Sequence, residues 1–377
     1  MSLAEKNIYQ HIMQTGPISV ADFMTMALYD PQYGYYRVKD PLGKQGDFTT
    51  SPEISQIFGE IIGIWIAATW QQLGSPSPVT LVETGPGRGT LMADILRATK
   101  KLPNFHNNLH VCLLEINERL IQEQQATLEP LRNSLENLSW HSSIDKVPND
   151  TPVIFIGNEF FDALPIHQFV KTNEGWRERM INCKPSSQTL EFALSPPVSL
   201  PKILHKKTIK KIQEAPLGAV YEYCPTAIDI TTQISERIAE HNGAALFIDY
   251  GYYENQLNDT FQAVKKHQYH CPLSDIGEAD LTAHVDFSTL ANTASQYNIR
   301  AQGNCTQKDF LHMMGIDLRS SALMQQANKK QQQDITTAVT RLTSPTQMGT
   351  LFKCLALTHS DHPPAYGFAD TNNSLIS

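Results

Sequence analysis

A glycine-rich loop between a short apolar strand and an amphipathic helix constrains the fold of this chain more than any other feature. The apolar run 79–83 predicts a buried strand, glycines alternate through 85–89, and 90–99 has helical periodicity. Glycines at the exit of a strand permit a tight turn and let a ligand approach the backbone closely. The helix that follows begins with amide donors that point outward. The sequence therefore predicts a ligand site at the start of an α/β fold.

Further apolar strands and helical patterns alternate along the chain. Strands are predicted at 110–115, 138–141, 151–156, 243–249, 299–302 and 351–357, and helices at 18–28, 53–72, 118–128, 228–240 and 287–297. In the helix 53–72, Ser51 is the expected N-cap and Pro52 fits the first turn. The alternation indicates a doubly wound, mostly parallel sheet with helices on both faces.

The same patterns predict how the chain is divided. Residues 1–73 are expected to form a helical N-terminal cap, and residues 74–165 and 226–357 the ligand-binding core. Between them, 166–225 is expected to form an inserted antiparallel β lobe that faces the substrate, because a hairpin-type turn follows residue 171. The polar tail 358–377 is expected to be disordered.

Composition excludes several classes of function. The formal net charge of -8 disfavours nucleic acid as a bulk partner. The six cysteines form no C-x-x-C pair, so we expect reduced thiols, and no cluster predicts a metal site. No apolar run is long enough to span a membrane, and the N-terminus lacks the apolar stretch of a secretory signal. The expected compartment is the cytoplasm.

The details of the glycine loop indicate which ligand it holds. Glu83 lies two positions before Gly85, and Gly87 and Gly89 complete a G-x-G-x-G spacing. The pyrophosphate fingerprint needs its third glycine one residue later, whereas this form is typical of S-adenosylmethionine sites. Glu115 ends the next strand, where a carboxylate can accept hydrogen bonds from both ribose hydroxyls. Together they predict an adenosyl cofactor; a glycine turn without ligand and an exposed carboxylate are the alternatives.

A second polar segment follows the strand 151–156. Asn158 offers an amide that can orient the cofactor or a target nitrogen. Glu159 and Asp162, three residues apart, would share a face of a helical turn and could hold a cationic guanidinium through charge-assisted hydrogen bonds. The alternative is that both carboxylates merely cap a helix. We predict that these three residues form the catalytic set.

Six segments together resemble one known family. They are 46–53, 83–91, 157–165, 248–251, 280–287 and 348–353. In this order they resemble the MidA-type methyltransferases, to which the mitochondrial complex I assembly-factor arginine methyltransferase belongs. The resemblance spans roughly residues 17–357. It implies a class I methyltransferase (Rossmann-like) fold, S-adenosyl-L-methionine as the methyl donor and a protein arginine side chain as the acceptor.

The resemblance also implies further site residues. Asp47, Thr50 and Ser51 would belong to a segment that closes over the cofactor. On the opposite wall, the acceptor would meet the side chains of Tyr250, His284 and Asp286. The identity of the acceptor protein is left open, and so is a homodimer. The alternatives to arginine methylation are an assembly or chaperone protein for a respiratory-type complex, with the cofactor as structural support, and a small-molecule methyltransferase.

Overall fold

The protein is described by a computed structural model that covers residues 2–38, 50–135, 137–184, 186–201, 206–254 and 256–369. The chain forms two compact units. The core unit comprises Thr50–Phe160, Ile230–Tyr253 and the described residues from Leu290 onward. The accessory unit comprises Phe161–Asp229, Glu254–Thr289 and the described residues before Thr50. Each is described by itself.

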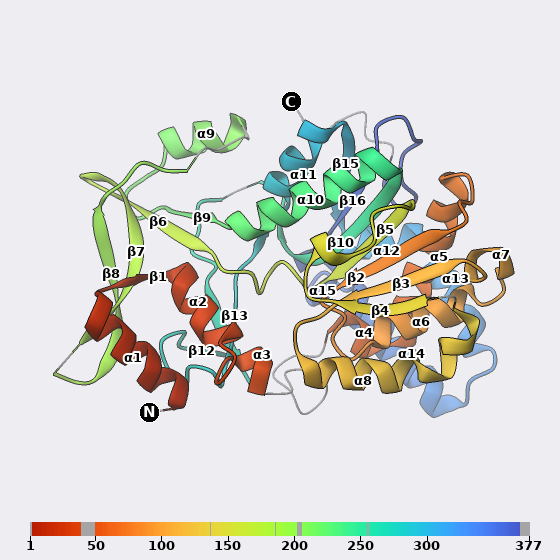
Figure 1. Ribbon diagram of the computed structural model, residues 1–377, viewed down its shortest axis with the longest axis horizontal. Coiled ribbons are helices and arrows are strands. Elements are labelled where there is room, and N and C mark those ends of the chain that lie inside the picture. The colour runs from red at the N-terminus through yellow and green to blue at the C-terminus, as the bar shows by residue number, and fades with distance from the viewer. Residues whose placement is uncertain are drawn as a thin grey trace. The chain divides into compact units, whose positions relative to one another are not determined.

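The core unit is built on a mostly parallel sheet (Figure 1). Its strands are β2 (Val79–Thr84), β3 (Leu109–Leu114), β4 (Asn137–His141), β5 (Val153–Asn158), β10 (Gly243–Tyr252), β15 (Ile299–Thr306) and β16 (Phe352–His359), in the order β15-β16-β10-β5-β2-β3-β4. The pairs from β10 to β4 are parallel, and β16 is antiparallel to both of its neighbours. Every position of β2 is buried, which is why its sequence is apolar without alternation. The expected fold class is confirmed.

The order of the strands reverses between β2 and β5. From β2 the chain proceeds to β3 and β4 on one side and then returns to β5 on the other side. Thr84 lies in register with Leu114 on one neighbour and with Gly157 on the other. The residues that follow these three positions therefore meet at one edge of the sheet. Ligands of open α/β sheets bind at such a reversal, outside the carboxyl ends of the strands.

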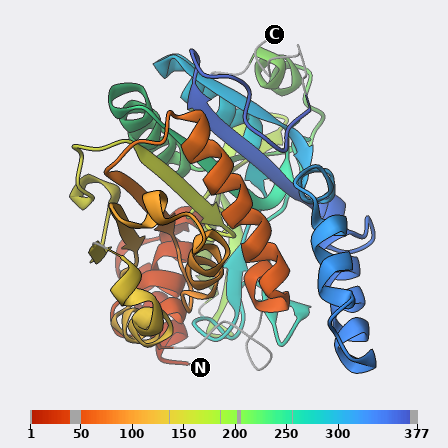
Figure 2. The same cartoon turned by 90° about the vertical axis from the view of Figure 1, so that its right-hand side faces the viewer.

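Helices cover both faces of this sheet. They are α4 (Ser51–Ile54), α5 (Gln56–Gln72), α6 (Thr90–Thr99), α7 (Pro103–His106), α8 (Glu118–Leu128), α12 (Gln307–Met313), α13 (Ile316–Met324), α14 (Lys329–Thr343) and α15 (Met348–Leu351), with 3-10 turns at Glu129–Ser134, Ile144–Lys146 and Ser295–Tyr297. α10 (Pro225–His241) and α11 (Phe287–Ala294) cross the boundary between the units. α5 and α10 lie on opposite faces of the sheet (Figures 1 and 2).

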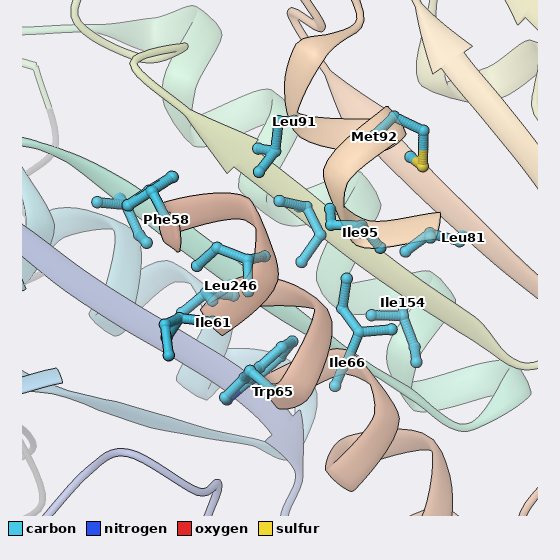
Figure 3. Close-up of a cluster of buried hydrophobic side chains, with 14 of the residues drawn as sticks. Phe58, Ile61, Trp65, Ile66, Leu81, Leu91, Met92, Ile95, Ile154 and Leu246 are labelled. Carbon is cyan, nitrogen blue, oxygen red and sulfur yellow. The ribbon is translucent and has the colours of Figure 1, made fainter. Parts of the chain in front are cut away.

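The main apolar core lies beneath α5 and α6. Phe58 and Trp65 of α5 are fully buried and converge with Ile95 of α6 onto Leu81 and Leu246 of the sheet (Figure 3). Burial of each such side chain contributes about 1.5–3 kcal/mol. This packing fixes α6, and therefore the loop that precedes it.

The predicted helix 53–72 is divided in two. Ser55 has an extended backbone between α4 and α5, and its side chain caps the amide of Ile57. The predicted cap is wrong by one residue, because Thr50 precedes α4 and Ser51 is its first helical residue. A serine that accepts a hydrogen bond from the next turn starts a new helix, and apolar periodicity alone does not reveal that break.

The accessory unit contains two antiparallel sheets and short helices. Its elements are α1 (Leu3–Thr15), β1 (Ile18–Ser19), α2 (Val20–Tyr29), α3 (Tyr35–Val38), β6 (His167–Thr172), β7 (Gly175–Lys184), β8 (Thr189–Pro197), α9 (Lys206–Gln213), β9 (Val220–Tyr223), β11 (Gln262–Lys265), β12 (Gln268–His270), β13 (Asp280–Thr282) and β14 (Val285–Asp286). One sheet has the order β1-β7-β6-β9, with β8 also paired to β7, and the other has the order β12-β11-β13. α1, α2 and β7 share a buried apolar cluster with β13.

Three features differ from the expected division of the chain. Residues 50–73 group with the core unit rather than with an N-terminal cap, and Glu254–Thr289, expected in the core, group with the accessory unit. The final strand runs to His359, and Ala365 and Phe368 beyond it are buried. The helices α12 to α14 were not expected, because they follow an irregular strand and have long polar faces. No helix in the described part of the chain is long and apolar enough to cross a membrane.

Candidate cofactor site at the carboxyl edge of the sheet

The glycine loop has a backbone that only glycine adopts easily. Gly85, Gly87 and Gly89 have φ angles of 62°, 53° and 78°. A Cβ atom at Gly85 would lie 3.0 Å from Cδ2 of Phe160, and one at Gly89 would lie 3.4 Å from Cα of Gln124. Gly89 is also the N-cap residue of α6 and has no side chain with which to cap it. The loop is a cradle that any other residue would partly fill.

Glu83 is a buried carboxyl group directly before this loop. Its side chain is 3% exposed, and burial raises its pKa to about 8 while the backbone amide of Met92 partly opposes the shift. Its Oε2 atom is buried and has no hydrogen-bond partner in the described chain. A buried carboxyl oxygen without a partner is costly, so the site suits a ligand that brings a hydrogen bond or a positive charge, and a bound positive charge would lower this pKa again.

Glu115 follows β3 and has a fixed orientation. Its Oε1 accepts from the backbone amides of Ile116 and Asn117, both at 2.8 Å. Its Oε2 accepts from Nε2 of Gln124 at 3.3 Å. A carboxylate held in this way at the end of the second strand can accept further hydrogen bonds from a ribose without rearranging.

Gln124 is a site residue that sequence analysis missed. It is fully buried, and its Nε2 donates to the carbonyl of Gly87 at 2.7 Å as well as to Glu115. Nε1 of Trp140 donates to its Oε1 at 2.8 Å. One amide therefore joins the loop to the carboxylate of the next strand. Its signal in the sequence was weak, since a polar residue in an amphipathic helix normally faces solvent.

Asn158 and Glu159 end the strand at the switch point. Glu159 has a φ of 53°, a strained value for a residue with a side chain, and its amide donates to the carbonyl of Ile248 at 2.9 Å. Its Oε1 accepts from Nδ2 of Asn158 and from the amide of Ser51, each at 3.0 Å. Oδ1 of Asn158 is buried without a hydrogen-bond partner in the described chain.

Ser51 is held by a second buried residue that sequence analysis missed. Its Oγ donates to Oε1 of Gln307 at 3.3 Å, and Nε2 of Gln307 donates to the carbonyl of Leu342 at 2.9 Å. Ser51 and Gln307 are both fully buried. A chain of hydrogen bonds thus links α14 and α12 to Glu159. No local pattern could have found it, because its members are far apart in the sequence.

The neighbourhood of Thr50 also reaches the glycine loop. Thr50 precedes α4, and Oε1 of Glu53 in that helix accepts from Oγ1 of Thr90 at 2.6 Å. Thr90 opens α6, so the segment 50–53 is tied to the start of the same helix as the loop. Asp47, the remaining residue expected here, lies outside the described residues.

Two of the residues expected to meet the acceptor have structural partners. Oδ1 of Asp286 accepts from the amides of Ser288 and Thr289, so this carboxylate caps the start of α11. The backbone amide of His284 donates to Oγ1 of Thr260 at 2.9 Å. The run Asp-Phe-Ser-Thr that begins at Asp286 is a capping signal that the sequence did contain.

The expected site residues are divided between the two units. Glu159 and Tyr250 belong to the core unit, whereas Asp162, His284 and Asp286 belong to the accessory unit. The ring of Tyr250 is 5% exposed and packs edge-on against Phe352, with 5.5 Å between ring centres. Glu83, the three loop glycines, Glu115, Asn158, Glu159, Thr50 and Ser51 are all in the core unit.

The residues of this edge fit an adenosyl cofactor. Two buried oxygens, on Glu83 and Asn158, need donors, and the backbone at Gly85 leaves space that a side chain would fill. S-adenosylmethionine carries an ammonium group, ribose hydroxyls and a sulfonium cation, which are the donors and positive charges that such a set can bind. The strand order and the site define the class I S-adenosylmethionine-dependent methyltransferases.

Comparisons with known proteins agree with this class. The family described as S-adenosyl-L-methionine-dependent methyltransferase matches residues 61–305. The mitochondrial protein arginine methyltransferase NDUFAF7 of Homo sapiens is 38% identical over 375 residues, which cover 93% of this chain and 82% of the relative. Its homolog in Drosophila melanogaster is 35% identical over 400 residues, which cover 97% of this chain and 88% of the relative.

A solved structure extends the similarity to the whole chain. A crystal structure from Burkholderia thailandensis, bound to S-adenosyl-homocysteine, has a TM-score of 0.82 at 25% identity and covers 98% of this chain and 95% of that chain. This chain belongs to the family of S-adenosyl-L-methionine-dependent methyltransferases that these relatives represent. The expected cofactor and enzyme class are confirmed.

Proposed function

We propose that this enzyme methylates the guanidino group of an arginine side chain in a protein. The proposal is carried by the carboxylate of Glu159, which is held in a strained turn at the switch point of the sheet. It is supported by relatives that are named protein arginine methyltransferases. A negative charge fixed in place before substrate arrives suits a cationic acceptor. The MidA-type subgroup remains our assignment within the family.

We assign the cofactor to the edge formed by the glycine loop. Gly85, Gly87 and Gly89 would let it approach the backbone, and Glu115 would accept from its ribose. Glu83 would receive its positive charge, and Thr50 and Ser51 would border it beside Asn158. When bound, the cofactor supplies a methyl group activated by a sulfonium. Asp47 belongs to the same proposal through the family resemblance.

The protein's own groups position the acceptor nitrogen. Glu159 would accept hydrogen bonds from the guanidinium, which holds one nitrogen in line with the methyl carbon. The buried Oδ1 of Asn158 would accept a further N–H, from the cofactor or from the acceptor. The nitrogen loses a proton when it gains the methyl group, and Glu159 or solvent takes that proton. We propose Asp162 as a second carboxylate for the same cation, and Tyr250, His284 and Asp286 as residues nearby.

Transfer of a labelled methyl group to a cell lysate tests the proposal. Label in protein that yields methylarginines after acid hydrolysis is the expected result. Label in low-mass products would instead make the enzyme a small-molecule methyltransferase. Tight cofactor binding with no labelled product would favour an assembly or chaperone protein that uses the cofactor as structural support.

The compartment and the binding partners of the enzyme are the next part of the proposal. We propose a reducing compartment, the cytoplasm, because all six cysteines are unpaired in the structure. The curated relatives are mitochondrial, so fractionation of cells that produce this chain decides between the two. We also propose that the lobe formed by 166–225 faces the protein substrate and that nucleic acid is not a partner. A homodimer is to be tested by light scattering.

The wild type is expected to lose stability as the pH rises from 7 to 8, and the variant Glu83→Gln is expected not to show the part of this loss that Glu83 causes. The folded-state pKa of about 8 lies above the ordinary 4.5, so the folded chain keeps a proton that the unfolded chain loses. The free energy of unfolding therefore falls as pH rises through this window, by roughly 1 kcal/mol from pH 7 to 8 for this group. Glu222, with a pKa raised by burial to about 7, acts mostly below that window. Urea titrations at pH 7 and pH 8 measure the free energy of unfolding of the wild type and the variant. The prediction is wrong if this free energy changes equally with pH in both proteins.

Gln307→Leu is expected to lower turnover about tenfold while the KM for the cofactor changes less than threefold. The leucine can neither accept from Ser51 nor donate to Leu342, so the backbone that supports Glu159 loses its anchor. Gln307→Glu keeps the acceptor for Ser51 and should retain more activity.

Gln302→Leu is the matched control for this change. Gln302 accepts from the amide of Ala365 in the same unit but does not contact Ser51. Steady-state kinetics and a melting curve are measured for each variant. An equal fall in turnover for Gln302→Leu would show that general destabilisation, rather than the position of Glu159, explains the result.

A further inference from the structure

A cluster of half-buried tyrosines and buried carboxylates lies within the accessory unit. The hydroxyl of Tyr36, in α3, donates to Oδ1 of Asp280 at 2.8 Å. Asp280 begins β13 and is 6% exposed. The ring of Tyr29, at the end of α2, lies 5.7 Å from the ring of Tyr36 between centres. An aromatic surface therefore stands beside a buried carboxylate.

Asp162 is fixed against the same elements. Its backbone carbonyl accepts from the amide of Ala283, directly after β13, at 2.9 Å, and its side chain is buried. The hydroxyl of Tyr29 donates to the carbonyl of Ala163 at 2.8 Å. Burial, and after it the charges of Asp280, Tyr29 and Asp162, raise the pKa of Tyr36 well above its usual value. The bond from Tyr36 places Asp280 at β13, and the bond from Ala283 places the backbone of Asp162 beside the same strand.

An unpartnered hydroxyl faces this cluster. Side chains alternate along a strand, so Thr282 and Asp280 of β13 point to the same side. Thr282 is 1% exposed, and its Oγ1 has no hydrogen-bond partner in the described chain. Buried polar groups in folded proteins are normally hydrogen-bonded, so this oxygen indicates a ligand that supplies a donor.

We propose that Asp162, Asp280 and Tyr36 bind the guanidinium group of the acceptor arginine, with Thr282 as a further acceptor. This inference rests on the proposed function and names its substrate subsite. A guanidinium presents a planar fork of N–H donors, which matches carboxylate oxygens, and it stacks on aromatic rings. An ammonium group is compact and strongly hydrated, and it fits such a set less well. In the sequence, Asp162 follows Glu159, the carboxylate of the proposed reaction, by three residues.

Binding of ethylguanidinium tests the subsite without cofactor or turnover. Saturation-transfer NMR with the full-length protein compares it with propylammonium as the probe. The wild type should bind ethylguanidinium at least tenfold more tightly than propylammonium. Asp280→Asn should weaken ethylguanidinium binding about tenfold, and Tyr36→Phe, which keeps the ring but loses the bond to Asp280, should weaken it less.

The control variant is Asp275→Asn in the same unit. Asp275 is half exposed and pairs with Lys265, so its removal should leave ethylguanidinium binding unchanged. S-adenosylhomocysteine affinity, measured by calorimetry, should be the same in all variants. If Asp280→Asn does not fold, Thr282→Val decides the question: it should fold as the wild type does and bind ethylguanidinium more weakly.

Two failures of this test are distinguishable. Ethylguanidinium binding that is equal in the wild type, Asp280→Asn and Thr282→Val would overturn the subsite but leave arginine methylation open. Selective binding that depends on Asp280, without any methylarginine formed in a lysate, would instead uphold the subsite and reject the proposed reaction.

Discussion

Gly85→Ala is expected to weaken the binding of S-adenosylhomocysteine by roughly 100-fold. A displacement of a binding group by about 1 Å commonly has an effect of this size. The φ angle of 62° strains any L-residue, and the new Cβ would lie 3.0 Å from the ring of Phe160. The backbone of Phe160 is anchored, since its amide donates to Oδ2 of buried Asp249 at 3.1 Å, so its ring or the loop has to shift. Calorimetry measures the change in affinity.

Gly74→Ala is the matched control, which separates the effect of backbone strain from the effect of filling the cofactor site. Gly74 has a φ of 89° in the same unit, and a Cβ there meets nothing within 4 Å. Both variants should therefore lose a similar stability, about 1 kcal/mol, from the left-handed backbone. Only Gly85→Ala should lose affinity. An affinity within threefold of the wild type for Gly85→Ala would exclude the loop as the cofactor site.

Local sequence patterns predicted much of the fold. The apolar run 79–83 became β2 (Val79–Thr84), and the helix predicted at 90–99 became α6 (Thr90–Thr99). Strands buried on both faces must be apolar throughout, and tight loops at their ends must contain glycine, so both can be recognised in a short stretch of sequence. The fold class and the cofactor were predicted from these local patterns.

Long-range polar contacts could not be predicted in the same way. Gln124 and Gln307 are fully buried amides. Apart from Glu115, the partners of Gln124 lie at least 16 residues away in the sequence, and those of Gln307 lie at least 35 residues away. Propensity treats a glutamine in a helix as a surface residue. Only the packed structure shows that one joins the glycine loop to Glu115 and the other supports Ser51.

The sequence also did not reveal which stretches of the chain form the accessory unit. It brings together α2, β6 to β9 and β11 to β13, which come from three separate stretches of the chain. Asp162 and Asp280 are more than 100 residues apart in the sequence, yet the amide of Ala283 holds the backbone of Asp162 beside β13. A sequence motif identifies each stretch but not the contact between them.

Glu159→Gln is expected to lower turnover by roughly 100-fold or more while the affinity for S-adenosylhomocysteine stays within threefold. The glutamine carbonyl can still accept from the amide of Ser51 and from Nδ2 of Asn158, so the strained turn keeps its supports. What is lost is the negative charge that would face the guanidinium, and with it the alignment of the attacking nitrogen. Single-turnover measurements separate this step from product release; they use, in unmethylated form, the acceptor protein that becomes labelled in the lysate.

Glu236→Gln is the matched control, because Glu236 lies exposed on α10 in the core unit and the same atoms are exchanged. Its turnover and cofactor affinity should equal those of the wild type. If Glu159→Gln turned over as fast as Glu236→Gln, the charge at the switch point would have no part in the chemistry. If cofactor affinity fell while turnover at saturating cofactor did not, Glu159 would belong to the cofactor site alone, because loss of a contact that only binds the cofactor leaves the saturated rate unchanged.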